Sequence, residues 1–272
     1  MIYLFYMGSV GRVLCLWAVL AGAGSLAAAE EPLAALDRRL AAGEVQLEFE
    51  REGGRGWLRS LLAALDVPVS SQTLVFSKTS AQFRLIHPGN PRALYFNDVG
   101  WVRGGPILEL SSADPAGVGV FYTLDQRPAE RPRFDRDRGL CLQCHESARS
   151  QGIPGHFVRS VFPSPDGQPL FAAGSANVLD TTPMVERWGG WYVSGSMGGA
   201  HRGNALYSTI EAVDAWEKAP AESRVDLRAR FDPAPYLAPG SDPVALLVLT
   251  HQVQMHNYIA RAGQEARRAL AY

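Results

Sequence analysis

One five-residue motif constrains this chain more than any other feature. Residues 141–145 read Cys-Leu-Gln-Cys-His, and the only other cysteine, Cys15, lies in an apolar segment near the start of the chain. A disulfide between Cys141 and Cys144 would close too small a ring to stabilise a fold by much. Two intervening residues instead allow one helical turn to place both sulfur atoms along one edge, while His145 projects beside them. The motif therefore calls for a specific chemistry at one place in the fold.

The start of the chain differs in composition from the rest. Arg12 is the only charged residue before the apolar run from Val13 to Ala21, and an Ala-Ala-Ala triplet occupies 27–29. A short positive start, an apolar stretch and an alanine-rich exit are typical of a secretory signal peptide. The apolar run is too short to cross the roughly 30 Å hydrocarbon core as a helix. We therefore expect 1–29 to be a signal peptide of a periplasmic protein that keeps no membrane anchor after its removal; a retained anchor is the alternative.

The motif and the predicted export point to the same cofactor. In c-type cytochromes, two thiols separated by two residues add to the vinyl groups of haem, and the adjacent histidine binds its iron. That attachment takes place in the compartment to which a signal peptide leads, and a covalent bond prevents loss of the cofactor to the medium. We therefore expect haem c to be attached at Cys141 and Cys144, with His145 as an iron ligand.

Two other uses of a Cys-x-x-Cys-His sequence need to be weighed. A structural zinc site needs four ligands, so His156 or His201 would have to complete a set that contains only one cysteine pair. A thiol-disulfide enzyme places its first cysteine at the start of a helix, just after a buried strand. Here residues 131–139 read Arg-Pro-Arg-Phe-Asp-Arg-Asp-Arg-Gly, which predicts a charged loop in that place. The sequence therefore favours haem over both alternatives.

Composition and residue patterning predict a single α+β domain over 30–272. Hydrophobic residues make up 47% of the chain and charged residues 19%, and the formal net charge is -1, so we expect neither wholesale disorder nor nucleic-acid binding. Leucine and alanine spacing predicts helices at 32–40, 56–65 and 243–269. Runs of β-branched and aromatic residues predict strands at 73–76, 93–96, 101–103, 107–110, 118–123, 157–162, 169–172 and 191–194. The motif then lies mid-chain in a mixed domain of antiparallel strands and short helices that ends in a long helix.

The second axial position of the iron has several candidate ligands. An electron carrier normally fills that position with Met or His, whereas an enzyme usually leaves it open or weakly held. His251 and Met255 lie four residues apart on one face of the predicted C-terminal helix, and His256 lies about 140° around the helix from His251. We expect His251 to be the distal ligand or a residue of the distal pocket. Met184, which follows a Thr-Pro pair, is the runner-up, and Met197, Met255 and His256 are further candidates.

Polar residues after the motif are candidates for contacts with the haem propionates. A guanidinium suits a carboxylate, because its N–H groups form a planar fork. We expect His156 and Arg159 to bind the cofactor, and His201, Arg187 and Arg202 are further candidates. An ordinary surface position is the alternative for each arginine.

Several segments resemble a group of large bacterial single-haem c-type cytochromes, proteins with a cytochrome c domain and an undefined substrate. The segments are Ala-Leu-Tyr-Phe-Asn-Asp at 93–98 with Gly-Trp-Val at 100–102, the motif itself, Gly-His-Phe-Val-Arg-Ser-Val-Phe at 155–162, Arg-Trp-Gly-Gly-Trp-Tyr-Val at 187–193, and His-Gln at 251–252 with His-Asn at 256–257. The resemblance spans most of residues 70–260 and implies haem binding and redox activity, but no substrate. The organisation of this chain differs from that of the small helical cytochrome c domain. In that domain, the haem motif lies near the start of the sequence.

Two functions are consistent with these features. An electron-transfer cytochrome would pass single electrons to and from a redox partner protein or a small-molecule donor or acceptor. A haem-dependent oxidoreductase or peroxidase-like enzyme would use the mixed domain to build an open distal pocket. The motif alone favours the carrier, because most proteins that bear it move electrons, whereas the length of the chain favours the enzyme. We expect an exported electron-transfer cytochrome, with the enzyme as the alternative.

Overall fold

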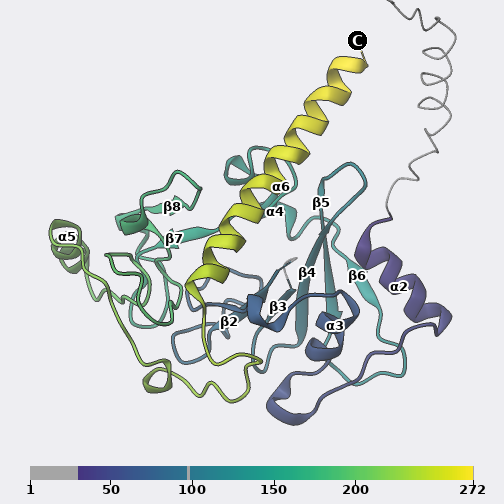
Figure 1. Ribbon diagram of the computed structural model, residues 1–272, viewed down its shortest axis with the longest axis horizontal. Helices are drawn as coiled ribbons and strands as arrows, with labels where there is room; N and C mark the ends of the chain where they lie inside the picture. The colour runs from purple at the N-terminus through teal and green to yellow at the C-terminus, as the bar shows by residue number, and fades with distance from the viewer. Residues whose placement is uncertain (1–29, 97–98, 272) are drawn as a thin grey trace, which may run out of the picture. The chain divides into compact units, whose positions relative to one another are not determined.

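The computed structural model describes residues 30–96 and 99–271, and the residues from Glu31 onward belong to one compact unit (Figure 1). The predicted signal peptide, 1–29, lies outside the described residues, as do Asn97 and Asp98 of the segment 93–98. Among the described helices, none combines the length and the apolar composition that a membrane crossing requires.

A six-stranded antiparallel sheet is the main scaffold. Each strand pairs with the next one along the chain, so the order in the sheet is the order in the sequence. The strands are β1 (Thr73–Val75), β2 (Arg92–Tyr95), β3 (Val99–Trp101), β4 (Ile107–Ala113), β5 (Gly119–Asp125) and β6 (Phe134–Arg136). A second, two-stranded antiparallel sheet pairs β7 (Arg159–Val161) with β8 (Ser175–Asn177).

The described helices are mostly short, and one long helix ends the chain. They are α2 (Pro32–Ala42), α3 (Leu58–Ala64), α4 (Leu142–His145), α5 (Ile210–Lys218) and α6 (Pro243–Leu270), with 3-10 turns at Glu52–Gly54, Val69–Ser71, Ala148–Ser150, Phe171–Ala173, Met184–Glu186 and Leu227–Ala229. The start of α6 is fixed by Asp242, whose carboxylate accepts hydrogen bonds from the first free N–H groups of the helix. Together with the sheet, these helices confirm the predicted α+β class.

The two faces of the six-stranded sheet carry different side chains, because residues alternate between faces along a strand. On one face, Leu110 of β4 and its cross-strand partner Tyr122 of β5 belong to a core that includes leucines of α2 and α3. The next residues along these strands, Ser111 and Phe121, are also cross-strand partners and point to the other face. This second face of the sheet contacts the segment that contains the motif.

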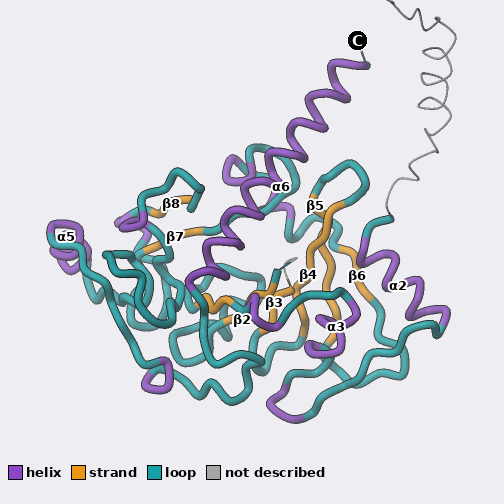
Figure 2. Tube along the Cα trace, viewed as in Figure 1, coloured by secondary structure: helices purple, strands orange, loops and turns teal. Residues whose placement is uncertain are grey.

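A separate apolar cluster holds α6 against the chain that follows the motif. Leu246, Leu249 and Val253 of α6 pack with the buried indole rings of Trp188 and Trp191. Most of the chain between β6 and α6 is loop and turn (Figure 2), so this cluster and hydrogen bonds from side chains fix its course.

Two of the predicted strands are wrong. Residues 171–173 form a 3-10 turn. The chain at 191–194 is not a regular strand, because its N–H groups are divided among three different segments. Tyr192 donates to the carbonyl of Leu74 in β1, Ser194 donates to the carbonyl of Ser241, and Val193 donates to the side chain of Asn204.

Three elements were not predicted: β6, β8 and α5. β6 falls in the stretch predicted as a charged loop, since Phe134 is its one buried residue and Asp135 and Arg136 are exposed. An edge strand can carry charged residues on its outer side, because it pairs with only one neighbour. The charged residues of this segment therefore predicted a loop where the structure has a strand.

Candidate functional site

The motif folds as a single helical turn that a carboxylate holds in place. Asp137 accepts hydrogen bonds from the backbone N–H groups of Gly139, Leu140 and Cys141 at 2.9, 3.2 and 3.0 Å. In α4, the N–H of His145 then donates to the carbonyl of Cys141 at 2.9 Å. Both motif cysteines are free thiols.

The electrostatic surroundings of Cys141 oppose the use of this thiol as a nucleophile. Burial raises the pKa of Cys141 to about 12, and the neighbouring carboxylate of Asp137 contributes to the rise. The reactive cysteine of a thiol-disulfide enzyme has the opposite property, a lowered pKa that yields a thiolate at neutral pH. The strand before the motif, β6, is also an edge strand of an antiparallel sheet. These two observations weigh against the thiol-disulfide alternative.

The imidazole of His145 is oriented by the backbone of Gly155. Nδ1 of His145 lies 2.8 Å from the carbonyl oxygen of Gly155, and because that oxygen only accepts, Nδ1 carries the proton. The N–H of Gly155 donates in turn to the carbonyl of His145 at 2.9 Å, and the hydroxyl of Ser150 donates to the same carbonyl at 2.7 Å. Nε2 is therefore the ring nitrogen of His145 with a lone pair to offer a metal ion.

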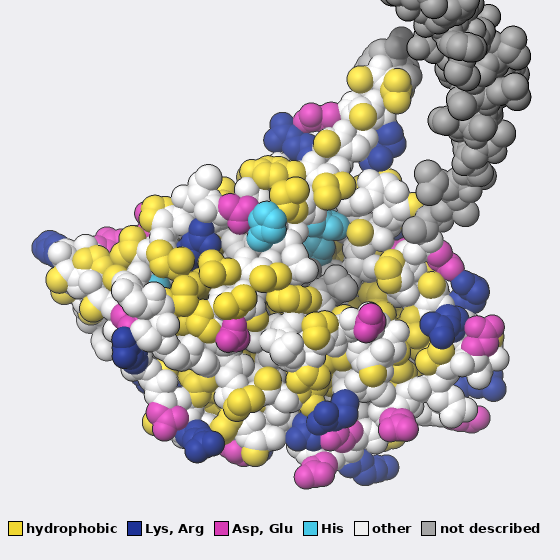
Figure 3. Space-filling view, in the orientation of Figure 1, with side chains coloured by type: hydrophobic (Ala, Val, Ile, Leu, Met, Phe, Trp, Pro, Cys, Tyr) yellow, Lys and Arg dark blue, Asp and Glu magenta, His cyan; other side chains and the backbone are white. Residues whose placement is uncertain are grey.

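Aromatic rings surround His145. Its ring centroid lies 4.6 Å from that of Phe121, 5.1 Å from that of Phe157 and 6.0 Å from that of His156. The ring of His156 packs edge-on against that of His256 of α6, with centroids 4.8 Å apart. The structure thus brings three histidines together. Figure 3 shows, without distinguishing individual residues, histidine side chains at the surface beside α6 and next to hydrophobic side chains.

The second face of the sheet positions His156. Nε2 of His156 lies 2.8 Å from the hydroxyl oxygen of Ser111 on β4. The ring of Phe121, opposite Ser111 on β5, lies 5.5 Å from the ring of His156. His156 was predicted to bind the cofactor, and it lies beside the predicted iron ligand.

The guanidinium of Arg159 lies near Cys144, and only some of its hydrogen-bond donors have partners among the described residues. Burial lowers the pKa of its guanidinium, and the positive charge of Arg149 lowers it further. One Nη donates to Ser175 at 3.0 Å, while the buried Nε has no hydrogen-bond partner among the described residues. A partly buried cation with a spare donor suits an anionic group of a bound molecule.

The structure does not bring His251 into the group around His145. His251 is on the exposed side of α6, and its Nδ1 lies 2.9 Å from the carboxylate of Asp180. At 100° per residue, it points about 140° away from His256, the histidine that contacts His156. Met255 and Met184 are exposed as well.

Three further candidates have other partners. Arg187 is buried and donates to the backbone carbonyls of residues 179, 180 and 182. Arg202 stacks on the ring of Phe162 and pairs with Glu217 at 3.3 Å. His201 is buried beside Trp188, and burial lowers its pKa although Glu222 lies nearby. These side chains hold the loops after the motif together.

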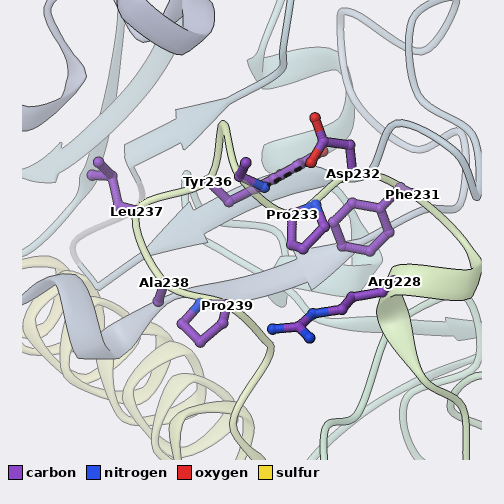
Figure 4. Close-up of a pocket in the computed structure, with 9 residues that line it drawn as sticks. Arg228, Phe231, Asp232, Pro233, Tyr236, Leu237, Ala238 and Pro239 are labelled. Atoms are coloured by element: carbon purple, nitrogen blue, oxygen red, sulfur yellow. Dashed lines mark hydrogen bonds between the residues drawn. The ribbon is translucent and has the colours of Figure 1, made fainter.

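The described residues hold no second cluster of metal ligands, and a large open pocket lies away from the motif. Within 30–96 and 99–271, no three His, Cys, Asp or Glu side chains are grouped so that they could hold a metal ion by themselves. This open pocket has a volume of about 740 Å³ and follows the loop 228–239. Figure 4 shows residues that line it, among them Phe231, Pro233 and Pro239. None of the residues that line it belongs to the motif or to the group around His145.

Comparison with known proteins finds no matching family model, no similar curated protein and no similar solved structure.

Proposed function

We propose that this chain is an exported c-type cytochrome that carries haem on Cys141 and Cys144, holds its iron through His145 and acts in periplasmic electron transfer. One observation carries the proposal beyond the motif: the hydrogen bond from Nδ1 of His145 to the carbonyl of Gly155. A metal-binding histidine almost always donates its second ring N–H to a carbonyl or carboxylate, which fixes the ring and makes the other nitrogen a better ligand. The Nε2 atom of His145 meets that description.

The residues around the motif fit a covalently attached haem. A thioether forms when the S–H bond of a thiol adds across a vinyl double bond, so sulfur joins one carbon, hydrogen joins the other, and no oxidant is needed. Cys141 and Cys144 are free, and the pKa of Cys141, about 12, keeps its proton in place at neutral pH. The spare Nε of Arg159, close to Cys144, suits a propionate.

When bound, haem supplies a one-electron Fe(III)/Fe(II) couple. The chain contributes the conditions in which that couple operates. Gly155 keeps the ring of His145 in one orientation, and the rings of Phe121 and Phe157 exclude water from its sides. A rigid, partly dry ligand environment limits reorganisation when the charge changes, which suits electron transfer.

For the second axial position, the contacts favour His256 over the predicted His251. The ring of His256 contacts His156, which in turn lies beside His145, whereas His251 pairs with Asp180 at the surface. If haem is bound, His256 would be its second iron ligand, and the predicted His251 remains the alternative.

A haem-dependent oxidoreductase is the second candidate function, and the pair of His156 and His256 favours it. Two imidazoles in contact beside an iron ligand can take up and release protons, which peroxide or small-molecule chemistry needs. Addition of CO to the reduced protein and of cyanide to the oxidised protein separates the two functions. An electron carrier with both axial positions filled keeps its absorption spectrum, whereas an enzyme with an open position changes it.

The proposal is tested by co-expression of the full chain with a c-type maturation system, followed by denaturing electrophoresis and a haem-peroxidase stain. We expect a stained band for the wild type and for Gln143→Ala, a control that changes an exposed residue between the cysteines. We expect no stain for Cys141→Ser combined with Cys144→Ser. An unstained wild-type band would overturn the proposal.

A further inference from the structure

A single peptide group links the candidate iron ligand to the C-terminal helix. The carbonyl of Gly155 and the N–H of His156 belong to the same planar peptide unit. The carbonyl accepts from Nδ1 of His145 at 2.8 Å, and the N–H donates to Oδ1 of Asn257 in α6 at 3.0 Å. Because the unit is rigid and trans, a hydrogen bond at one end fixes the direction in which the other end points.

Asn257 forms hydrogen bonds with both backbone groups of His156, its N–H and its carbonyl. In addition to the contact at Oδ1, its Nδ2 donates to the carbonyl of His156 at 2.6 Å. Asn257 is 4% exposed and His156 is 7% exposed, so water does not compete effectively for these bonds. The two residues lie 101 positions apart, and α6 crosses the region of α4 and its following loop in Figure 1. The long helix thereby fixes a loop that has little regular structure of its own.

The close approach of Asn257 requires glycine at 155. A Cβ atom at that position would lie 2.3 Å from Oδ1 of Asn257, which is shorter than any real contact of that kind. The preceding carbonyl, that of Pro154, accepts from the N–H of Gly119 at the start of β5 at 2.9 Å. The peptide is therefore held by the sheet before it and by α6 after it.

We propose that Asn257 is a positioning residue for His145, acting through the peptide between Gly155 and His156. A hydrogen bond to the N–H end of a peptide group polarises the group and makes its carbonyl a stronger acceptor. A stronger acceptor at Nδ1 makes the imidazole more basic, which stabilises ferric over ferrous iron and lowers the reduction potential. This inference rests on the proposed attachment of haem and adds to it a residue that sets the properties of the iron.

The test compares Asn257→Leu with a matched control, Gln254→Met, in the haem-loaded full chain. Both residues are buried on α6, and Gln254 accepts from the N–H of Asp180, whereas Asn257 accepts from the N–H of His156. We expect Asn257→Leu to change the ferric-to-ferrous preference at least about tenfold, which is a rise in potential of about 59 mV for one electron. The amide proton of His156 should also exchange faster with solvent in Asn257→Leu. The control should leave both readouts unchanged.

A second variant disturbs the same contact by a change at Gly155 instead of Asn257. Gly155→Ala displaces the amide of Asn257, so we expect a rise in potential in the same direction, and in combination with Asn257→Ala we expect no further rise. Covalent haem together with a wild-type potential in Asn257→Leu would overturn the inference, as would fully additive effects in the double variant. A wild-type protein without covalent haem would instead overturn the proposed function on which the inference rests.

Discussion

Ser111 of β4 and Phe121 of β5 are cross-strand partners, and through this pair the sheet reaches two histidines. The hydroxyl of Ser111 lies 2.8 Å from Nε2 of His156, and the ring of Phe121 contacts the rings of both His156 and His145. A slip of the β4–β5 register by one residue would place these two side chains on opposite faces of the sheet, because only residues that are directly opposite share a face. The pairing of two strands therefore fixes the side-chain environment of the motif.

Replacement of Phe121 with Ala should destabilise the fold and expose His145. Phe121 is 6% exposed, and loss of a buried phenylalanine ring costs about 3–5 kcal/mol of unfolding free energy. Urea denaturation of the variant measures this loss. The control is Phe171→Ala, which removes a ring that is 71% exposed and should change the free energy of unfolding by no more than about 0.5 kcal/mol. Equal effects of the two substitutions would contradict the assigned packing.

Asp137→Asn should lower the pKa of Cys141. The substitution removes the negative charge next to the thiol but keeps an oxygen that can accept from the N–H of Cys141. The pKa should fall from about 12 but stay above the ordinary 9.0, because burial is the larger cause of the rise. The pH dependence of alkylation in haem-free protein with Cys144→Ser reports this pKa. Asp135→Asn, at an exposed position of β6, serves as the control, and an identical profile for both variants would refute the role of Asp137.

Folding stability should fall in mildly acidic solution because of His201. Burial lowers the pKa of His201 below 6.5, so the unfolded chain takes up a proton in a range where the folded protein does not. Stability is then complete above about pH 6.5 and is lost as the pH falls from there to the folded pKa. His201→Gln should flatten this part of the curve of unfolding free energy against pH. A slope that the substitution leaves unaltered would show that other groups cause it.

His251→Ala and His256→Ala should have different effects on the absorption spectrum. If His256 fills the second axial position, its removal converts a low-spin spectrum to a high-spin one, whereas His251→Ala leaves the spectrum as it was. The opposite result would restore His251, the residue expected from the sequence. A spectrum that neither substitution alters would show that neither histidine of α6 is the distal ligand, which leaves Met255 and the candidates outside α6.

The parts of the site that follow from local spacing were predictable, and those that depend on distant contacts were not. The motif can be recognised from five consecutive residues. The long C-terminal helix can be predicted from the spacing of its leucines. Gly155, Phe121 and Ser111 become significant only through the contacts that the fold brings about. Asn257 did carry a signal, since it lies on the buried side of α6 in line with Val253 and Ala260, where a polar residue needs a partner.

The strands were predictable only in part, for the same reason. Runs of apolar residues predicted β4 and β5, but the alternation that sends Ser111 and Phe121 toward the motif depends on register, which the sequence of one strand does not contain. The exposed position of His251 could not be predicted either, because its neighbours one turn earlier on the same side of α6, Leu247 and Val248, are apolar, although Val248 is itself exposed.

The intact mass of the matured protein, measured under denaturing conditions, shows whether haem is bonded covalently to Cys141 and Cys144. We expect the polypeptide to carry the added mass of one haem, its iron included, and we expect Cys141→Ser together with Cys144→Ser to remove all of it. A wild-type protein that is made by cells able to attach haem, and that nevertheless has the mass of the bare polypeptide, would contradict the account.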